Sequence, residues 1–191
     1  RRPRPLPEVL GTLCRTVAEI ARVDVVSLYV REAPEDVLVL RANVGFPASA
    51  IGQVRLAVGE GITGFVAECL RPVSAAMAPR EERYKHVPGL GEERFPAYLG
   101  VPLVSGGTAA GVLVLQRREA RAFSAQEIAL VAALAAPCAF ALESARTRKG
   151  EGGLPSGTSS RSAHLTGTGV SPGTAVGHVE LLPSLDESGR L

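Results

Sequence analysis

The sequence has few aromatic side chains and almost no net charge. Trp is absent, aromatic residues make up 4% of the chain, and 21 basic residues stand against 19 acidic ones, for a formal net charge of +2. Nucleic-acid binding depends on a basic surface, and binding to single strands also depends on stacked aromatic rings. Attraction to an anionic membrane surface likewise requires positive charge. We therefore expect neither a nucleic acid nor a membrane as a partner.

Cysteine is also scarce. The chain has three cysteines, Cys14, Cys69 and Cys138, which lie far apart among apolar residues, with no Cys-x-x-Cys pair and no Cys/His cluster. Disulfide frameworks and zinc sites both require paired, regularly spaced ligands. We therefore expect three buried thiols and no metal site. His86 has no second metal ligand near it in the sequence, so we interpret it as a loop or surface residue.

Long hydrophobic segments are missing too. The longest apolar run, Ile128 to Leu142, has 15 residues, whereas a membrane-spanning helix needs about 20. No signal peptide is recognisable in the sequence. Hydrophobic residues still make up 46% of the chain, which is enough for a packed core. These features predict a globular protein of the cytoplasm.

The sequence does contain a regular succession of helix and strand patterns. Apolar residues spaced three or four apart from Leu6 to Ile20 predict a helix. Ser124-Ala125-Gln126-Glu127 is a capping-box pattern, which predicts the start of a long helix that continues to about Arg148. Gly106-Gly107 predicts the tight turn of a β-hairpin. Further segments are expected as strands at 25–30, 37–44, 54–58, 72–77, 98–104 and 110–116, as a helix at 62–70, and as a helical turn at 81–85.

These elements predict an α+β fold with a mostly antiparallel central sheet. The terminal helices are expected on one face, and helix 62–70 with the long loop 78–97 on the other. A loop of this length in a compact domain is usually functional or mobile. The apolar surface of the terminal helices exceeds what one sheet face can cover, which predicts a homodimer formed through a helical bundle. The alternative is that the helices pack only on each other and on the sheet.

The C-terminal part differs in composition from the rest. Residues 149–168 are rich in Gly, Ser and Thr, as flexible linkers are. Residues 169–191 begin with Gly169-Val170-Ser171-Pro172-Gly173, a turn that leads into a strand pattern. The chain ends before a further domain could be completed. We expect this segment to be the truncated start of one.

Several strings of residues between 6 and 148 resemble those of GAF domains. They are Val26-Ser27-Leu28-Tyr29-Val30, Val58-Gly59-Glu60-Gly61-Ile62-Thr63-Gly64, Tyr98-Leu99-Gly100-Val101-Pro102-Leu103, Gly111-Val112-Leu113-Val114-Leu115-Gln116 and Phe123-Ser124. Their order and spacing are similar to the family's pattern. The resemblance implies a GAF fold and a ligand pocket between the sheet and its covering helix and loop.

The C-terminal segment carries a further resemblance. Gly169 to Gly177 looks like the opening of enzyme I-type phosphoenolpyruvate–protein phosphotransferases, and Arg80 to Gly100 is similar to the nitrogen-related branch of these enzymes. This resemblance implies a sensory domain that controls autophosphorylation of a downstream enzyme. It also implies glutamine or 2-oxoglutarate as the effector, a phosphocarrier protein as partner of the catalytic part, and Mg²⁺ as the cofactor of that part. In this chain itself we expect no catalytic residue and no cofactor.

The implied pocket and the long loop give a set of candidate ligand-binding residues. Gly61 begins a helix whose free N–H groups favour an anion, and arginine side chains of the loop could hold a carboxylate through two parallel hydrogen bonds. The full set is Ser27, Tyr29, Gly61, Arg80, Arg83, Tyr84, Lys85, Arg94 and Phe95. The alternative is that the basic residues pair with acidic neighbours on the surface, namely Glu81, Glu82, Glu92 and Glu93.

Two other functions stay open at this point. The domain could be a dimerisation module whose pocket binds nothing. It could also resemble the GAF-fold enzymes that reduce free methionine sulfoxide, but that chemistry requires a nucleophilic and a resolving cysteine in the pocket. Only Cys69 lies near that region. The residue patterns of cyclic-nucleotide-binding and bilin-binding GAF domains are not found in the sequence.

Overall fold

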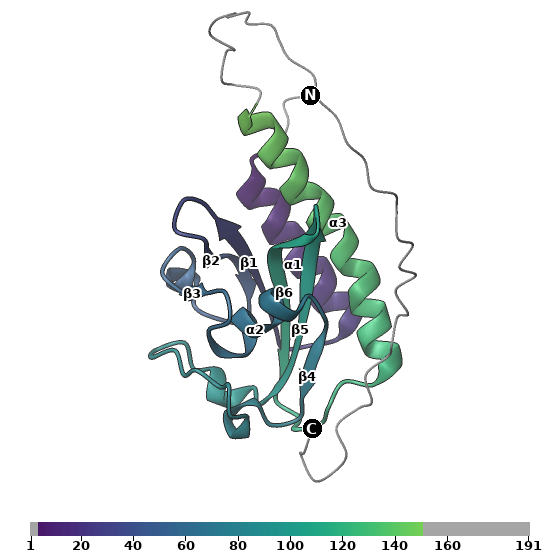
Figure 1. The fold of residues 1–191 in the computed structure, drawn as a ribbon. Coiled ribbons are helices and arrows are strands. Elements are labelled where there is room, and N and C mark those ends of the chain that lie inside the picture. The colour runs from purple at the N-terminus through teal and green to yellow at the C-terminus, as the bar shows by residue number, and fades with distance from the viewer. Residues whose placement is uncertain (1–3, 151–191) are drawn as a thin grey trace, which may run out of the picture. The chain divides into compact units, whose positions relative to one another are not determined.

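A six-stranded antiparallel sheet forms the centre of the fold (Figure 1). The structure is a computed structural model, which describes residues 4–150. The strands are β1 (Val25–Glu32), β2 (Val37–Val44), β3 (Arg55–Ala57), β4 (Val73–Ala75), β5 (Ala97–Ser105) and β6 (Thr108–Arg117). Their order across the sheet is β3-β2-β1-β6-β5-β4, and each neighbouring pair is antiparallel. The predicted α+β fold is confirmed.

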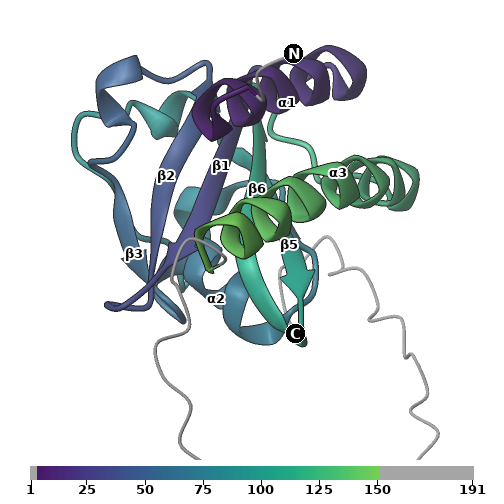
Figure 2. The ribbon, with the colours of Figure 1, turned by 90° about the horizontal axis from the view of Figure 1, so that it is seen from above.

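Two long helices cover one face of the sheet. Helices α1 (Leu6–Ala21) and α3 (Ala125–Gly150) lie side by side on this face, as Figure 2 shows. Leu10 of α1 and Leu142 of α3 join a common core with Leu113 of β6. Burial of such side chains is the main stabilising contribution to this layer.

Helix α2 (Gly61–Cys69) and the loop 78–97 cover the opposite face. A second core lies there, and it includes Tyr29 of β1, Val66 of α2 and Val114 of β6. Successive side chains of a strand point to opposite faces, so the central strands β1 and β6 contribute to both cores. The predicted placement of terminal helices and loop on opposite faces of the sheet is therefore confirmed.

Two short sequence signals have the predicted geometry. Gly106 and Gly107 close the hairpin between β5 and β6 with φ angles of 58° and 79°, values that favour glycine. At the start of α3 the backbone N–H of Glu127 donates to Ser124 Oγ at 3.2 Å, and the backbone N–H of Ser124 donates to the Glu127 carboxylate at 2.7 Å. This reciprocal pair is the capping box that the sequence predicts.

The long loop differs from its prediction in one respect. Residues 4–150 include three short 3-10 helices, at Ala48–Ala50, Ala78–Arg80 and Glu92–Arg94, and the last two lie in this loop. Residues 81–84 form only a turn, in which the Tyr84 N–H donates to Glu81 O at 2.9 Å. The predicted helical turn at 81–85 is thus wrong, because helical geometry forms earlier, where Pro79 fixes a helical φ. The predicted linker at 149–168, past the end of α3, and the predicted truncated domain at 169–191 lie outside the described residues.

Helix α3 keeps one apolar face uncovered in the described part of the chain. Cys138 on its inner side is buried, whereas Leu130 and Phe140 are 42% and 72% exposed. Exposed Ala133 and Pro137 lie between them in the sequence, and we call these four residues the α3 outer face. By length and composition the helix would also pass as a membrane span, which is weak evidence because core helices of soluble proteins pass the same test.

Candidate functional site

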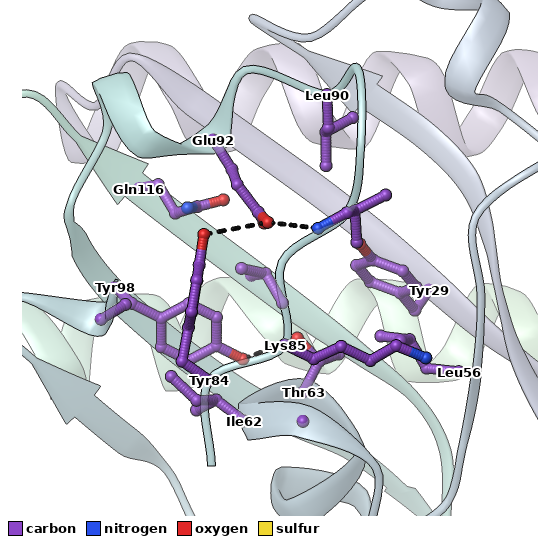
Figure 3. A pocket seen from close by; sticks show the side chains of 14 residues that line it. Tyr29, Leu56, Ile62, Thr63, Tyr84, Lys85, Leu90, Glu92, Tyr98 and Gln116 are labelled. Atoms are coloured by element: carbon purple, nitrogen blue, oxygen red, sulfur yellow. Dashed lines mark hydrogen bonds between the residues drawn. The ribbon is translucent and has the colours of Figure 1, made fainter. Parts of the chain in front are cut away.

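A small cavity lies between the sheet, α2 and the long loop, and we call it the loop cavity. Its volume is about 40 Å³, far below the roughly 300–1,000 Å³ of typical small-molecule sites. Its wall is formed by Tyr29, Leu56, Gly61, Ile62, Thr63, Ala78, Tyr84, Lys85, Val87, Leu90, Glu92, Tyr98, Val114 and Gln116 (Figure 3). With the loop in this position, the loop cavity therefore holds little more than a water molecule.

The sheet side of the loop cavity presents hydroxyl and amide groups. Tyr29 comes from β1, Tyr98 from β5 and Gln116 from β6. The hydroxyls of Tyr98 and Thr63 are hydrogen-bonded at 3.0 Å, and Gln116 Nε2 donates to Phe95 O at 3.2 Å. Burial raises the pKa of both Tyr29 and Tyr98. Both hydroxyls therefore stay protonated and can donate hydrogen bonds to a ligand.

The loop side contributes a carboxylate. Glu92 Oε1 accepts hydrogen bonds from Tyr84 Oη at 3.0 Å and from the Val87 N–H at 2.7 Å, and the Glu92 side chain is only 11% exposed. Figure 3 shows both bonds as dashed lines that end at Glu92. His86 Nδ1 lies 3.5 Å from the same oxygen. Burial raises the pKa of Glu92, against the opposing effect of the bond from Val87.

A second carboxylate fixes the loop to the start of α2. Lys85 forms an ion pair with Glu60, and Glu60 also accepts a hydrogen bond from the Ala57 N–H at 2.8 Å. The bond from Lys85, more than that from Ala57, lowers the pKa of Glu60. Gly61 has a φ of 65°, and a Cβ at this position would lie 3.2 Å from Lys85 Cβ. Glycine therefore permits the close contact between loop and helix.

The structure brings four of the predicted site residues together and separates the others from them. Tyr29, Gly61, Tyr84 and Lys85 line the loop cavity. Ser27 is buried, and its hydroxyl has no hydrogen-bond partner among the described residues. It shares the sheet face of Tyr29, two residues away along β1, but does not line the cavity.

The aromatic and arginine candidates of the loop also lie outside the cavity wall. Arg80 is exposed, Arg83 lies over the Phe65 ring at 4.2 Å, and Arg94 lies over the Phe95 ring at 5.5 Å. Phe95 is buried and contacts Phe46, with ring centroids 5.9 Å apart. Among the described residues these arginines form no ion pair with the neighbouring glutamates. A role for them in binding stays a prediction.

Four polar residues of the wall are not among the predicted ligand-binding residues, namely Thr63, Glu92, Tyr98 and Gln116. Glu92 was assigned only a surface pairing role, whereas its carboxylate points into the domain. Gln116 could have been found from the sequence, because a polar residue near the end of an otherwise apolar central strand indicates a possible site residue. No feature of the sequence singled out Thr63 or Tyr98 as a site residue, since hydroxyl-bearing residues are common on half-buried helices and strands.

The cysteines do not contribute to the loop cavity. Cys14 and Cys138 belong to the core under α1 and α3, and burial raises their pKa values to about 12 and about 11. Cys69, at the end of α2, is partly exposed, so the expectation of three buried thiols is wrong for it: the last turn of the helix reaches the surface. Within residues 4–150 no group of three or more His, Cys, Asp or Glu side chains could hold a metal ion.

Comparison with known proteins gives one consistent result. The sequence profile of the GAF domain family matches residues 3–143. The "Phosphoenolpyruvate-dependent phosphotransferase system" protein of Escherichia coli (strain K12) is 32% identical over 99 residues, which cover 52% of this chain. The match spans only 13% of the length of that protein.

Solved structures of GAF domains are also similar to this chain. The GAF domain from a phosphoenolpyruvate-protein phosphotransferase of Coxiella burnetii is 32% identical with a TM-score of 0.73, over 78% of this chain and 89% of that one. The corresponding Acinetobacter domain is 25% identical with a TM-score of 0.69, over the same shares of the two chains. A free methionine-R-sulfoxide reductase from Thermoplasma acidophilum is 20% identical with a TM-score of 0.61, over 73% of this chain and 96% of that one, which shows a common fold alone.

Proposed function

The chain belongs to the GAF domain family, and on this basis we propose that it is a small-molecule-sensing domain that controls autophosphorylation of a phosphoenolpyruvate–protein phosphotransferase. The observation that carries the proposal is the polar loop cavity, closed by a loop on the sheet face opposite α3. The similarity to GAF domains of two such phosphotransferases supports the assignment of the parent protein.

Sensing would operate by a shift between a closed and an open loop. A cavity of about 40 Å³ cannot hold an amino acid or a keto acid. Binding therefore requires the loop 78–97 to move outward, and the ligand stabilises whichever loop arrangement it contacts better. In this proposal, the structure with its cavity of about 40 Å³ represents the closed state.

Strand β6 offers a physical connection from the loop to α3. Gln116 in the cavity wall holds the carbonyl of Phe95 at the end of the loop. The next residue, Arg117, donates to the Glu127 carboxylate at 2.7 Å and to the carbonyls of Arg121 and Ala122 at 3.0 Å each. Consecutive strand residues face opposite sides of the sheet, so a displacement of this strand end acts on the cavity and on the start of α3 together.

The effector and the partners follow from the resemblance to the nitrogen-related branch. We expect glutamine or 2-oxoglutarate as the effector and a role in nitrogen regulation. The parent protein would act in the cytoplasm, use Mg²⁺ in its catalytic part and pass the phosphoryl group to a phosphocarrier protein.

A thermal-shift titration of the full chain with glutamine and with 2-oxoglutarate tests the sensing role. A ligand at a hundred times its dissociation constant adds about 2.7 kcal/mol to the free energy of unfolding, or about 5–10 °C in Tm for a domain of this size. Cyclic AMP and free methionine sulfoxide serve as comparison compounds. Absence of a shift with both candidate effectors would contradict the proposal.

A second candidate function is dimerisation without sensing. It is favoured by the α3 outer face and by an open groove of about 810 Å³ between α1 and α3, whose lining includes Leu6, Pro137 and Phe140. We propose that a second copy of the chain covers this surface in a homodimer, because exposed apolar patches of this kind mark interaction sites. Sedimentation equilibrium measures the dimer, and a dimer that responds to no metabolite would favour this function over sensing.

The enzymatic alternative has little support in the described residues. Reduction of methionine sulfoxide needs a thiol beside the bound substrate, and none of the three cysteines lines the loop cavity. Turnover of free methionine sulfoxide that disappears in Cys69→Ser would be required to establish this activity.

A further inference from the structure

We propose that the sheet binds a buried water molecule between Ser27 of β1 and Asn43 of β2. The inference starts from the buried polar side-chain atoms that have no hydrogen-bond partner. In the described part of the chain these atoms are Ser27 Oγ, Asn43 Nδ2 and Arg117 Nε. The first two belong to residues that lie opposite each other, and the inference does not depend on the sensing role.

Ser27 and Asn43 are neighbours across two strands. They are paired in the register of β1 and β2, and the Cβ atoms of such paired residues are about 4.5–5.5 Å apart. Val26 and Ala42, which adjoin them in the chain, belong to the core under α1 and α3. Because successive side chains of a strand alternate between faces, Ser27 and Asn43 both point to the opposite face of the sheet.

The surroundings of the pair are apolar. Ser27 is only 1% exposed. Val25 and Tyr29 flank it along β1, Val114 of β6 is paired with it, and all three belong to the second core. A polar group without a partner is costly in such surroundings. Buried polar atoms of folded proteins therefore almost always have a partner, which is either another protein group or an ordered water molecule.

An irregularity of the sheet lies next to the pair. The register of β1 and β2 shifts between Leu28 and Tyr29, one residue beyond Ser27. A bulge of this kind increases the local twist of the two strands. It gives a physical reason why the polar side chains of Ser27 and Asn43 face each other but form no hydrogen bond.

A water molecule matches the hydrogen-bonding groups of the pair. The Asn43 amide nitrogen donates, the Ser27 hydroxyl can donate or accept, and water does both at once. A half turn of the Asn43 amide would present Oδ1 instead of Nδ2, and a water molecule satisfies either atom. Buried water usually has two to four polar partners, of which this pair supplies two. A charged ligand does not fit, because Val25, Tyr29 and Val114 offer it no counter-charge.

The proposed water site lies beside the loop cavity. Tyr29 and Val114 line that cavity, whereas Ser27 and Asn43 do not. A water molecule held by this pair would connect β1 to β2 behind the cavity wall. It would therefore be a part of the folded domain that stays in place whether or not an effector is bound.

A crystal structure of the full chain at high resolution tests the site directly. We expect density for a water molecule within about 2.7–3.2 Å of both Ser27 Oγ and Asn43 Nδ2. Absence of this density, or a direct hydrogen bond between the two side chains, would overturn the inference.

A double-mutant cycle in urea-induced unfolding tests the shared water independently. Ser27→Ala and Asn43→Ala should each raise the equilibrium constant for unfolding about fivefold. The double variant should lose less than the product of the two factors, because both changes remove partners of the same water. The matched control combines Asn43→Ala with Ser74→Ala. Ser74 lies on β4 at the edge of the sheet, where its Oγ accepts from the Phe123 N–H at 3.1 Å, so the control factors should multiply.

The cycle can also contradict the inference. If the Ser27 hydroxyl has no water partner, Ser27→Ala removes an unpaired buried group and should leave stability unchanged or raise it. Either result would overturn the proposal, as would factors for Ser27→Ala and Asn43→Ala that multiply like those of the control pair. If a variant does not fold, as judged by circular dichroism, the crystal structure of the unaltered chain decides.

Discussion

Removal of the Arg117 side chain should cost the domain much of its stability at the junction between β6 and α3. The guanidinium is 8% exposed and donates to Glu127 and to two backbone carbonyls. It also lies 4.0 Å above the Phe123 ring. In Arg117→Ala the carbonyls of Arg121 and Ala122 lose their donor, and the ring loses its cation.

The expected magnitude follows from these contacts. Breaking a buried ion pair by removal of one partner costs about 3–5 kcal/mol. Glu127 is 30% exposed and keeps a bond from Arg121 at 3.2 Å, so it is not left without a cation. The cost should therefore lie at the lower limit, about 3 kcal/mol, which corresponds to about 6–12 °C in Tm.

Urea-induced unfolding followed by circular dichroism measures this cost. Arg118→Ala is the matched control, because Arg118 is 69% exposed and its ion pair with Asp24 has an N–O distance of 3.6 Å. Such surface pairs contribute less than about 1 kcal/mol. Equal losses in the two variants would refute the assignment of Arg117 as the residue that holds α3 to the sheet.

The same contact should make stability depend on pH. Hydrogen bonding from Arg117 is the main cause that lowers the pKa of Glu127 from 4.5 to about 2. A carboxyl group with a lowered folded-state pKa stabilises the fold above its unfolded pKa and loses this contribution as the pH falls through the folded value. The difference in unfolding free energy between the unaltered chain and Arg117→Ala should therefore shrink between about pH 4.5 and pH 2. A constant difference over this range would contradict the explanation.

Three further changes test other parts of the structure. Gly61→Ala should lower the unfolding free energy by about 1–2 kcal/mol, because alanine is strained at a φ of 65° and its Cβ would approach Lys85. Thermal unfolding measures this loss, and an unchanged Tm would show that the loop adjusts freely. Tyr98→Phe removes the hydroxyl bonded to Thr63 and should lower the unfolding free energy by about 1 kcal/mol, measured in urea. Phe140→Ser should shift a dimer toward monomer in sedimentation experiments with an unchanged circular dichroism spectrum, since Phe140 is 72% exposed; an unchanged dimer would place the interface elsewhere.

Most of the fold could be predicted because its signals are local. The capping box at Ser124, the Gly106-Gly107 turn and the spacing of apolar residues in α1 each depend on a few neighbouring residues. The helical turn expected at 81–85 failed because the loop has no apolar period, and Pro79 shifted helical geometry toward residues 78–80.

The candidate site could be predicted only in part. Tyr84 and Lys85 were found because they lie in a long loop beside α2. The sequence predicts Glu92 on the surface, because a run of charged residues does not indicate which glutamate side chain points toward the cavity. Its orientation depends on donors at Tyr84 and Val87, and such pairing exists only after the loop has folded back on itself.

The internal bonding of the loop 78–97 has a consequence for how such a domain can diversify. Glu92, Tyr84 and Val87 satisfy one another within the segment, and the strand β5 that follows it is held by its own ladder with β6. A different segment between Ala78 and Ala97 would therefore need to replace only the contacts that this loop makes with the rest of the domain, such as the bond from Gln116 to Phe95 O and the packing of Leu90 and Phe95 in the second core. The lining of the loop cavity would then change through one stretch of sequence, while the core under α1 and α3 and the attachment of α3 stay as they are.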